Sequence, residues 1–158
     1  TGVANLRALR LRVQSAIAGA EGTDAPAPVL MTVDLDRFKL VNDRYNHTTG
    51  DQVLAAVARA VSETVRMDEM VARRGGDEFF VLFQNTAPDH IENVIPRVEE
   101  AIKHARERIC PDLVPTASVG YMMWRSGQTA DEFMESADGV MHDEKIETRA
   151  RGYAESAA

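Results

Sequence analysis

The sequence predicts an α/β (α+β) sandwich, in which helices flank a mixed central sheet. Three features favour this fold: strand-like apolar segments alternate with amphipathic helices, two adjacent segments form one central hairpin, and no internal repeat or domain boundary interrupts the pattern. The length of 158 residues fits one domain over residues 1–158 with a single sizeable core. Because the chain begins with Thr1 and not with methionine, we expect it to be a fragment of a longer protein.

The first part of the chain contains three helical segments and one strand. Apolar side chains recur at helical spacing over residues 6–20, and a loop rich in Pro and Gly follows over residues 22–28. The continuous apolar stretch 29–33 predicts a buried strand. Helical periodicity then predicts a short helix over residues 38–45 and a long helix over residues 50–66.

The second part adds three strands and two helices. Residues 70–73 and 79–83 are apolar stretches separated by a tight turn that contains glycine, which predicts a hairpin. Residues 88–109 predict a helix, interrupted or kinked at its internal proline. Residues 115–124 predict another strand. A threonine followed by two acidic residues marks the start of a last helix, which we expect over residues 129–148.

Composition and charge narrow the functional classes. Hydrophobic residues make up 44% of the chain and charged residues 27%, as in soluble globular proteins. The net charge of −7 argues against broad nucleic acid binding, and no apolar run is long enough to span a bilayer. The single cysteine, Cys110, excludes an internal disulfide and is typical of a reducing compartment. We therefore expect a cytoplasmic chain that contacts neither nucleic acid nor membrane, and it stays open whether the parent protein is attached to a membrane.

Two acidic clusters are the candidates for chemistry. Asp34 and Asp36 close the first predicted strand, and Asp77 and Glu78 follow two glycines in the hairpin turn. Taken separately, the first pair can simply end a strand and cap the next helix, and the second can be an ordinary charged hairpin tip. Taken together, two acidic strand ends in one sheet can hold a magnesium ion bound to a polyphosphate.

The chain resembles the GGDEF family of diguanylate cyclases along nearly its whole length. The matching motifs, in chain order, are the remnant Thr1-Gly2 with Asn5, the D-x-D-x-F-K-x-x-N-D run over residues 34–43, H-x-x-G-D over residues 47–51, GGDEF over residues 75–79, and S-x-G over residues 118–120. The resemblance implies a nucleotidyl cyclase or palm-like fold, related to ferredoxin-like folds. It also implies the condensation of two GTP into cyclic di-GMP and two pyrophosphates by a homodimer with Mg²⁺ or Mn²⁺, and a regulatory domain ahead of these residues in the parent protein.

The resemblance implies a role for each matched residue. Asp34, the backbone carbonyl of Leu35 and the carboxylate of Asp77 would bind the metal ion. Asp77 would also accept the proton of the ribose 3′-hydroxyl, and Glu78 would support the metal site. The substrate-binding positions that the resemblance implies are Phe38, Lys39, Asn42, His47, Asp51, Lys145 and Arg149.

Among these positions, Asn42 and Asp51 would recognise guanine, because a carboxylate can accept from its N1–H and its exocyclic amine together and adenine lacks that donor pair. Helix capping is the alternative for both residues. Lys145 and Arg149 lie four residues apart and share a helix face, where they would contact the triphosphate with Lys39. A solvated surface charge is the alternative for each of the three, and a structural role is the alternative for His47.

Several positions depart from the family pattern. Asn46 stands where glycine usually precedes the histidine, His142 replaces a tyrosine, and residues 148–150 read Thr-Arg-Ala in place of Gly-Arg-Asn. In the product-inhibition motif R-x-x-D, which begins here at Arg66, Glu69 replaces the aspartate, and we expect weak or absent feedback binding of cyclic di-GMP. The alternatives to an active cyclase are a silent domain that binds GTP and regulates an attached domain, an interaction module without metal, and an enzyme with relaxed base choice that makes a mixed cyclic dinucleotide.

Overall fold

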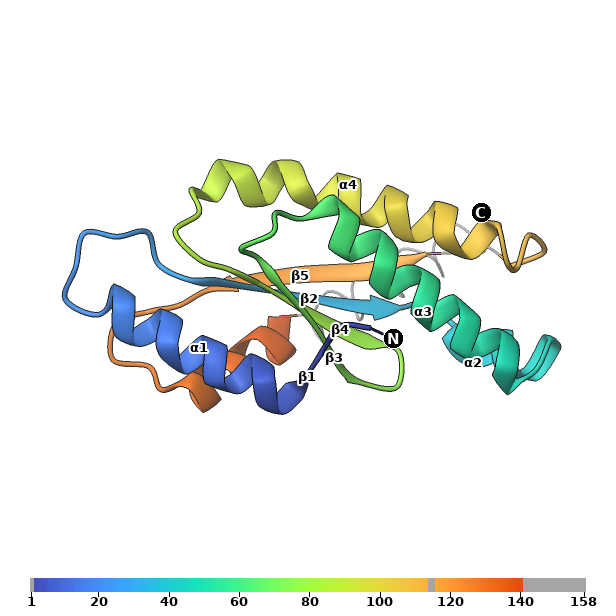
Figure 1. Cartoon of the computed structure of the whole chain (residues 1–158), viewed down its shortest axis with the longest axis horizontal. Coiled ribbons are helices and arrows are strands. Elements are labelled where there is room, and N and C mark those ends of the chain that lie inside the picture. Colours follow the sequence, from blue (N-terminus) through green and yellow to red (C-terminus); the bar gives the residue numbers. More distant parts are fainter. Residues whose placement is uncertain (1, 114–115, 141–158) are drawn as a thin grey trace, which may run out of the picture.

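The computed structural model of the protein describes residues 2–113 and 116–140, which form a five-stranded sheet with helices on both faces (Figure 1). The strand order is β1-β3-β4-β2-β5, in which β1 runs parallel to β3 and every other neighbouring pair is antiparallel. The predicted sandwich with a mixed sheet is thereby confirmed. The strands are Ala4–Asn5 (β1), Val29–Leu35 (β2), Met70–Gly75 (β3), Glu78–Phe83 (β4) and Ala117–Met123 (β5).

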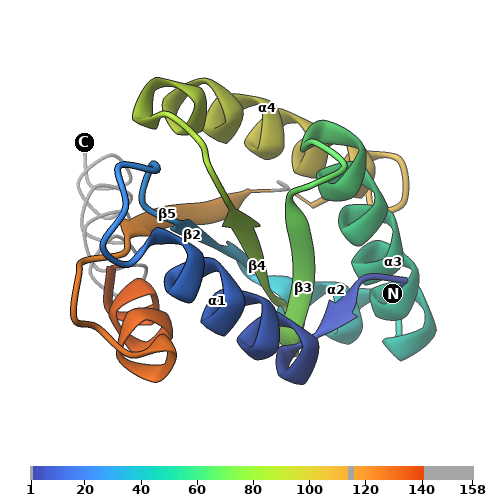
Figure 2. The same ribbon diagram turned by 60° about the vertical axis from the view of Figure 1, so that its left-hand side comes forward.

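The helices divide between the two faces of the sheet, as both views show (Figure 2). The labelled helices are Leu6–Ala20 (α1), Phe38–Arg44 (α2), His47–Thr64 (α3) and Pro88–Glu107 (α4). Residues 130–140 form a further helical segment beside α1. Helices α3 and α4 pack on one face of the sheet, while α1 and the helical segment 130–140 pack on the other.

Alternation along the strands assigns side chains to the two faces. Met31 and Phe79 belong to the core cluster under α3 and α4, whereas Leu30 and Phe80 belong to the cluster under α1 and the segment 130–140. Cys110 is buried in the first cluster, as expected for an apolar structural residue. No helix in the described part of the chain is both long enough and apolar enough to cross a membrane.

Most element boundaries differ from the sequence-based expectation by one to three residues, and four differences have a clear physical reason or a missing sequence signal. Strand β2 extends to Leu35 because β4 and β5 pair with it on both sides. Helix α3 begins at His47 because the side chain of Asn46 accepts from the N–H of Thr49 and caps the helix earlier. Helix α4 runs on through Pro96, so the proline does not interrupt it. The two-residue strand β1 carries no periodic signal and was not expected.

The last helix begins where the sequence predicts. The N–H of Glu132 donates to the hydroxyl of Thr129, and the N–H of Thr129 donates to the carboxylate of Glu132, which is a reciprocal capping arrangement. The hydrogen bond from the Thr129 backbone lowers the pKa of Glu132. The expected continuation beyond residue 140 lies outside the described residues.

Candidate functional site

The end of β2 lies beside the hairpin turn between β3 and β4. In the antiparallel pair β2–β4, Asp34 stands opposite Glu78, and the N–H of Leu35 donates to the carbonyl oxygen of Asp77 at 3.2 Å. Asp34 and Glu78 alternate in phase with Leu30 and Phe80, so both point to the face that α1 and the segment 130–140 cover. The structure therefore brings together the two acidic clusters that the sequence singles out.

A side chain of strand β3 stabilises the hairpin turn between β3 and β4. Gly76 takes a left-handed conformation (φ 54°), which favours glycine, while Gly75 does not take a positive φ. The guanidinium of Arg73 donates through Nε and Nη2 to the carbonyl oxygen of Gly76 at 3.0 and 2.7 Å. Asp77 follows this held peptide directly, so its backbone position is set by both Arg73 and Leu35.

The two clusters contribute an oxygen-rich ligand set. Asp34 is buried with 5% of its surface exposed, and Asp77 is half-buried. Among residues 2–113 and 116–140, no three His, Cys, Asp or Glu side chains gather closely enough to hold a metal ion on their own. Magnesium is usually held by only one or two carboxylates together with substrate phosphates and waters. Asp34, Asp77 and a backbone carbonyl at Leu35 fit that kind of site.

Asp36 has a structural role that the sequence did not separate from that of Asp34. Strand β2 ends at Leu35, and the carboxylate of Asp36 accepts from the hydroxyl of Ser118 at 2.8 Å. The N–H of Asp36 donates to the carbonyl oxygen of Thr116 at 3.0 Å. Arg37 then takes a left-handed conformation (φ 53°), unusual for a residue with a side chain, as the chain turns into α2.

A second group of predicted residues lies between α2 and α3. A Cβ added at Gly50 would lie 2.0 Å from Oδ1 of Asn42 and 3.3 Å from Cζ of Phe38, so a larger residue there would displace the side chain of Asn42 or shift α2. Asn42 is half-buried, and Asp51, next to Gly50, is exposed. The sequence motif included Gly50 but did not reveal this steric reason for it.

Helix capping does not explain Asn42 or Asp51. Asn42 lies inside α2 and Asp51 inside α3, whereas Arg37 and Asn46 occupy the capping positions of those helices. The capping alternative for both residues is therefore wrong. At Asn46 the backbone is extended (φ 179°), so this residue replaces the family's glycine without any left-handed conformation.

The predicted basic residues are only partly described. Lys39 in α2 is exposed, and so is His47, the first residue of α3. A surface charge thus remains an alternative for Lys39. Lys145 and Arg149 lie outside the described residues, as do the departures at His142 and at residues 148–150.

Glu78 takes part in a contact that the sequence did not reveal. Arg74 pairs with Glu78 at 3.3 Å and with Asp138, on the helical segment 130–140, at 2.7 Å. The guanidinium of Arg74 also lies over the ring of Phe80, 5.9 Å from its centroid. Burial raises the pKa of Asp138, and Arg74 partly offsets that rise. Arg74 therefore connects the carboxylate of the hairpin to the last helix.

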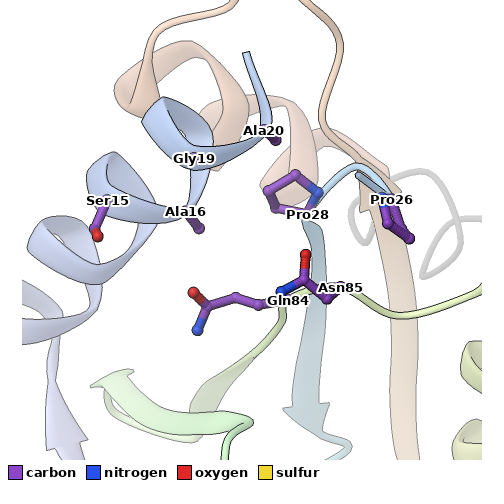
Figure 3. A pocket seen from close by; sticks show the side chains of 8 residues that line it. All are labelled: Ser15, Ala16, Gly19, Ala20, Pro26, Pro28, Gln84 and Asn85. Atoms are coloured by element: carbon purple, nitrogen blue, oxygen red, sulfur yellow. The ribbon is translucent and has the colours of Figure 1, made fainter. Parts of the chain in front are cut away.

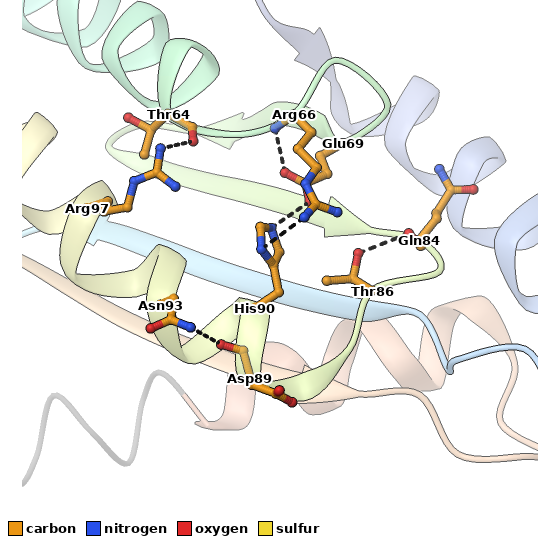
Figure 4. A network of polar contacts seen from close by, with 9 residues as sticks. All are labelled: Thr64, Arg66, Glu69, Gln84, Thr86, Asp89, His90, Asn93 and Arg97. Atoms are coloured by element: carbon orange, nitrogen blue, oxygen red, sulfur yellow. Dashed lines mark hydrogen bonds and ion pairs between the residues drawn. The ribbon is translucent and has the colours of Figure 1, made fainter.

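Arg66 and Glu69, the residues of the expected inhibitory motif, form an internal network (Figure 4). Glu69 is 7% exposed, and its Oε2 accepts from the backbone N–H of Arg66 at 2.6 Å. Its Oε1 lies 3.2 Å from Nε2 of His90, on α4, and the other ring nitrogen of His90 lies 3.4 Å from the Arg66 guanidinium. Both carboxylate oxygens of Glu69 are thus engaged inside the protein.

A separate cavity of about 120 Å³ lies at the opposite end of the sheet (Figure 3). Residues from the last turns of α1, from the loop just before β2 and from the segment just after β4 line it, among them Ser15, Pro28, Gln84 and Asn85. Strand β2 begins at this end, at Val29, and finishes at the other, at Leu35. The cavity is therefore not part of the acidic site.

The sequence of the chain matches a known family and known proteins. Residues 1–151 match the family described as "Diguanylate cyclase, GGDEF domain". The chain is 34% identical, over 154 residues, to the bifunctional diguanylate cyclase/cyclic di-GMP phosphodiesterase MucR of Pseudomonas aeruginosa, covering 97% of this chain and 22% of MucR. It is 28% identical, over 153 residues, to the diguanylate cyclase DosC of Escherichia coli K12, covering 96% of this chain and 33% of DosC.

The fold also matches solved structures. The GGDEF domain of DgcB from Caulobacter crescentus, solved in complex with c-di-GMP, superposes with a TM-score of 0.83 at 27% identity. That match covers 92% of this chain and 87% of the solved one. By contrast, the chain spans only 22% of MucR and 33% of DosC, about a fifth to a third of these curated relatives.

Proposed function

The chain belongs to the GGDEF family, and from this premise we propose that it is a diguanylate cyclase, which joins two GTP molecules into cyclic di-GMP. The observation that carries the proposal is the convergence of the two acidic clusters, in which Asp34 stands opposite Glu78 and Leu35 is hydrogen-bonded to Asp77. GTP is a nucleotide of the cell interior, so the proposal also favours a cytoplasmic site of action.

Asp34, the carbonyl oxygen of Leu35 and Asp77 would hold Mg²⁺ or Mn²⁺, which when bound supplies charge stabilisation at the α-phosphate. Asp77 would accept the proton of the attacking 3′-hydroxyl, a role that its half-buried position beside the strand end supports. Glu78 would stabilise the same site, with its orientation fixed by the contact with Arg74.

Substrate recognition would combine a base site and a phosphate site. Asn42 and Asp51 would recognise guanine, supported by the close approach of α2 to α3 at Gly50 and Phe38. Asp51 is exposed and can accept from two donors of the base. The phosphate-binding residues would be Lys39, Lys145 and Arg149, with His47 near the base site.

The reaction requires two copies of the domain. Each 3′-oxygen forms a bond to the α-phosphorus of the other GTP, the bond from that phosphorus to the β-phosphate bridging oxygen breaks, and pyrophosphate leaves. The hydroxyl proton passes to Asp77. One domain holds one GTP, so two domains must face each other as a homodimer, and catalysis would rest on positioning and on charge stabilisation.

The rate of product formation is therefore expected to rise faster than linearly with protein concentration. If the dimer is weak, doubling the concentration raises the rate up to about fourfold, by mass action. The measurement is incubation with GTP and Mg²⁺ over a range of protein concentrations, followed by detection of cyclic di-GMP by mass. A strictly linear dependence at low concentration would argue against weak dimerisation, and the absence of product at every concentration would refute the cyclase proposal.

A silent domain that regulates an attached one is the second candidate. The relative PdeR of Escherichia coli K12 favours it, because PdeR is 32% identical to this chain over 146 residues and is named only as a cyclic di-GMP phosphodiesterase. In that case the protein would bind a non-reactive GTP analogue with Mg²⁺ and form no product. A regulatory domain joined ahead of these residues in the parent protein is compatible with both candidates.

We expect cyclic di-GMP to bind weakly or not at all at Arg66 and Glu69, with a dissociation constant above about 100 μM. The reason is that the Glu69 carboxylate is buried and already contacts the Arg66 backbone and His90. Isothermal titration calorimetry of the protein with cyclic di-GMP measures this. Tight binding that Arg66→Ala abolishes, but Arg59→Ala on the exposed face of α3 does not, would show the expectation to be wrong.

A further inference from the structure

Arg106, in the last turn of α4, is a buried cation beside the proposed metal site. It is 2% exposed, and its side chain is one of the largest that are fully buried among the described residues. A buried charge is costly unless it is paired and hydrogen-bonded. Burial lowers the pKa of the Arg106 guanidinium, and the carboxylates of Asp36 and Asp77 oppose that shift. The hydrogen bonds of Arg106 show how its charge is accommodated.

The guanidinium joins two stretches of backbone. Its Nη1 donates to the carbonyl oxygen of Thr116, and its Nη2 donates to the carbonyl oxygen of Asp36 at 3.1 Å. Thr116 directly precedes β5, and Asp36 directly follows β2. A planar fork with several donors can bind two acceptors at once in a fixed geometry, which a lysine ammonium cannot reproduce.

The carbonyl of Thr116 also sets the direction of a neighbouring peptide. It accepts from the N–H of Asp36 at 3.0 Å, in addition to Nη1 of Arg106. That N–H belongs to the same planar peptide unit as the carbonyl of Leu35, so fixing one fixes the direction of the other. On the preceding peptide, the N–H of Leu35 donates to Asp77.

We propose that Arg106 is a positioning residue, which orients the carbonyl oxygen of Leu35 for metal binding by holding the carbonyls of Thr116 and Asp36 together. This inference rests on the proposed function, in which Leu35 supplies a backbone ligand. In this role Arg106 would act without touching the substrate. Its effect passes through Thr116 to the peptide that joins Leu35 to Asp36.

The test compares two substitutions of Arg106 with one matched control. Arg106→Lys keeps the charge but not the fork, and Arg106→Met removes both. Arg97→Met is the control, because Arg97 lies on the same helix and also donates to a backbone carbonyl, that of Thr64 at the end of α3 (Figure 4). Calorimetry with a non-reactive GTP analogue measures how the nucleotide affinity depends on Mg²⁺, and hydrogen exchange measures protection of the Asp36 amide.

Both Arg106 variants are expected to weaken Mg²⁺-dependent nucleotide binding by about 10- to 100-fold, the usual effect of losing a group that orients a metal ligand. The Asp36 amide should exchange faster in both, while the Leu30 amide, at the other end of β2, stays protected. If Arg106→Met fails to fold, Arg106→Lys carries the test. Arg97→Met should match the wild type.

Two outcomes would overturn the inference. One is an unchanged Mg²⁺-dependent affinity in a folded Arg106→Lys protein, which would mean that charge alone suffices. The other is an unchanged exchange rate at Asp36 in both variants. Wild-type protein that forms no cyclic di-GMP would instead refute the proposed function, and the exchange measurement would still decide whether Arg106 orients this peptide.

Discussion

Replacing Asp77 by asparagine is expected to abolish cyclic di-GMP formation, with a loss of roughly 1,000-fold or more. Loss of a general base alone typically costs 100- to 10,000-fold, and Asp77 would also be a metal ligand. Asparagine keeps the shape of the side chain but cannot accept the 3′-hydroxyl proton at neutral pH. The measurement is product formation from GTP and Mg²⁺, quantified by mass.

The loss should occur in a folded protein. Asp77 lies in a two-residue turn whose backbone is held by the hydrogen bonds of Arg73 to Gly76 and of Leu35 to Asp77, and asparagine keeps these contacts. The thermal midpoint of Asp77→Asn should therefore stay within a few degrees of the wild type. Asp24→Asn, in the exposed loop before β2, is the control and should retain full activity. Substantial product from a folded Asp77→Asn protein would exclude Asp77 as the base.

Replacing Gly50 by alanine is expected to weaken GTP binding at least about tenfold and to destabilise the fold by about 1–3 kcal/mol, as overpacking does. The new Cβ would lie 2.0 Å from the Asn42 side chain and 3.3 Å from Phe38, so Asn42 must move away from its proposed position beside guanine. Titration with a non-reactive GTP analogue and thermal unfolding measure the two effects.

The direction of the stability effect makes Gly50→Ala informative. Alanine inside a helix is normally more stable than glycine by about 0.5–1 kcal/mol. Gly19→Ala in α1 provides the matched control, because nothing lies within 4 Å of a Cβ added there. We expect Gly19→Ala to stabilise the protein and leave nucleotide affinity unchanged. A Gly50→Ala protein that behaves like Gly19→Ala would show that the contact with Asn42 does not matter.

The sequence was sufficient for the fold because its signals are local. The apolar stretch that becomes β2, the hairpin around Gly76 and the threonine cap at Thr129 each depend on neighbours within a few residues. The motif resemblance then paired Asp34 with Asp77, and the antiparallel register of β2 and β4 brings these two parts of the chain together.

The contacts that orient the site could not be predicted in the same way. Arg106 reaches Asp36, and Arg74 reaches Asp138, across long separations in sequence. From the sequence alone, a buried arginine in a helix cannot be distinguished from an exposed one. For the same reason Asn42 and Asp51 could not be separated from helix caps, since that required helix boundaries accurate to one or two residues.

Strand β1 belongs to the same sheet as the hairpin that carries Asp77. Asn5 lies beside Arg73 in a parallel pair, and its side chain also accepts from the N–H of Ala8 at the start of α1. The guanidinium of Arg73 in turn donates two hydrogen bonds to the carbonyl oxygen of Gly76. A polypeptide joined ahead of residue 2 would therefore connect directly to β1, which pairs with β3, the strand that leads into the turn. Only a few hydrogen bonds therefore separate a displacement of β1 from the backbone of Asp77.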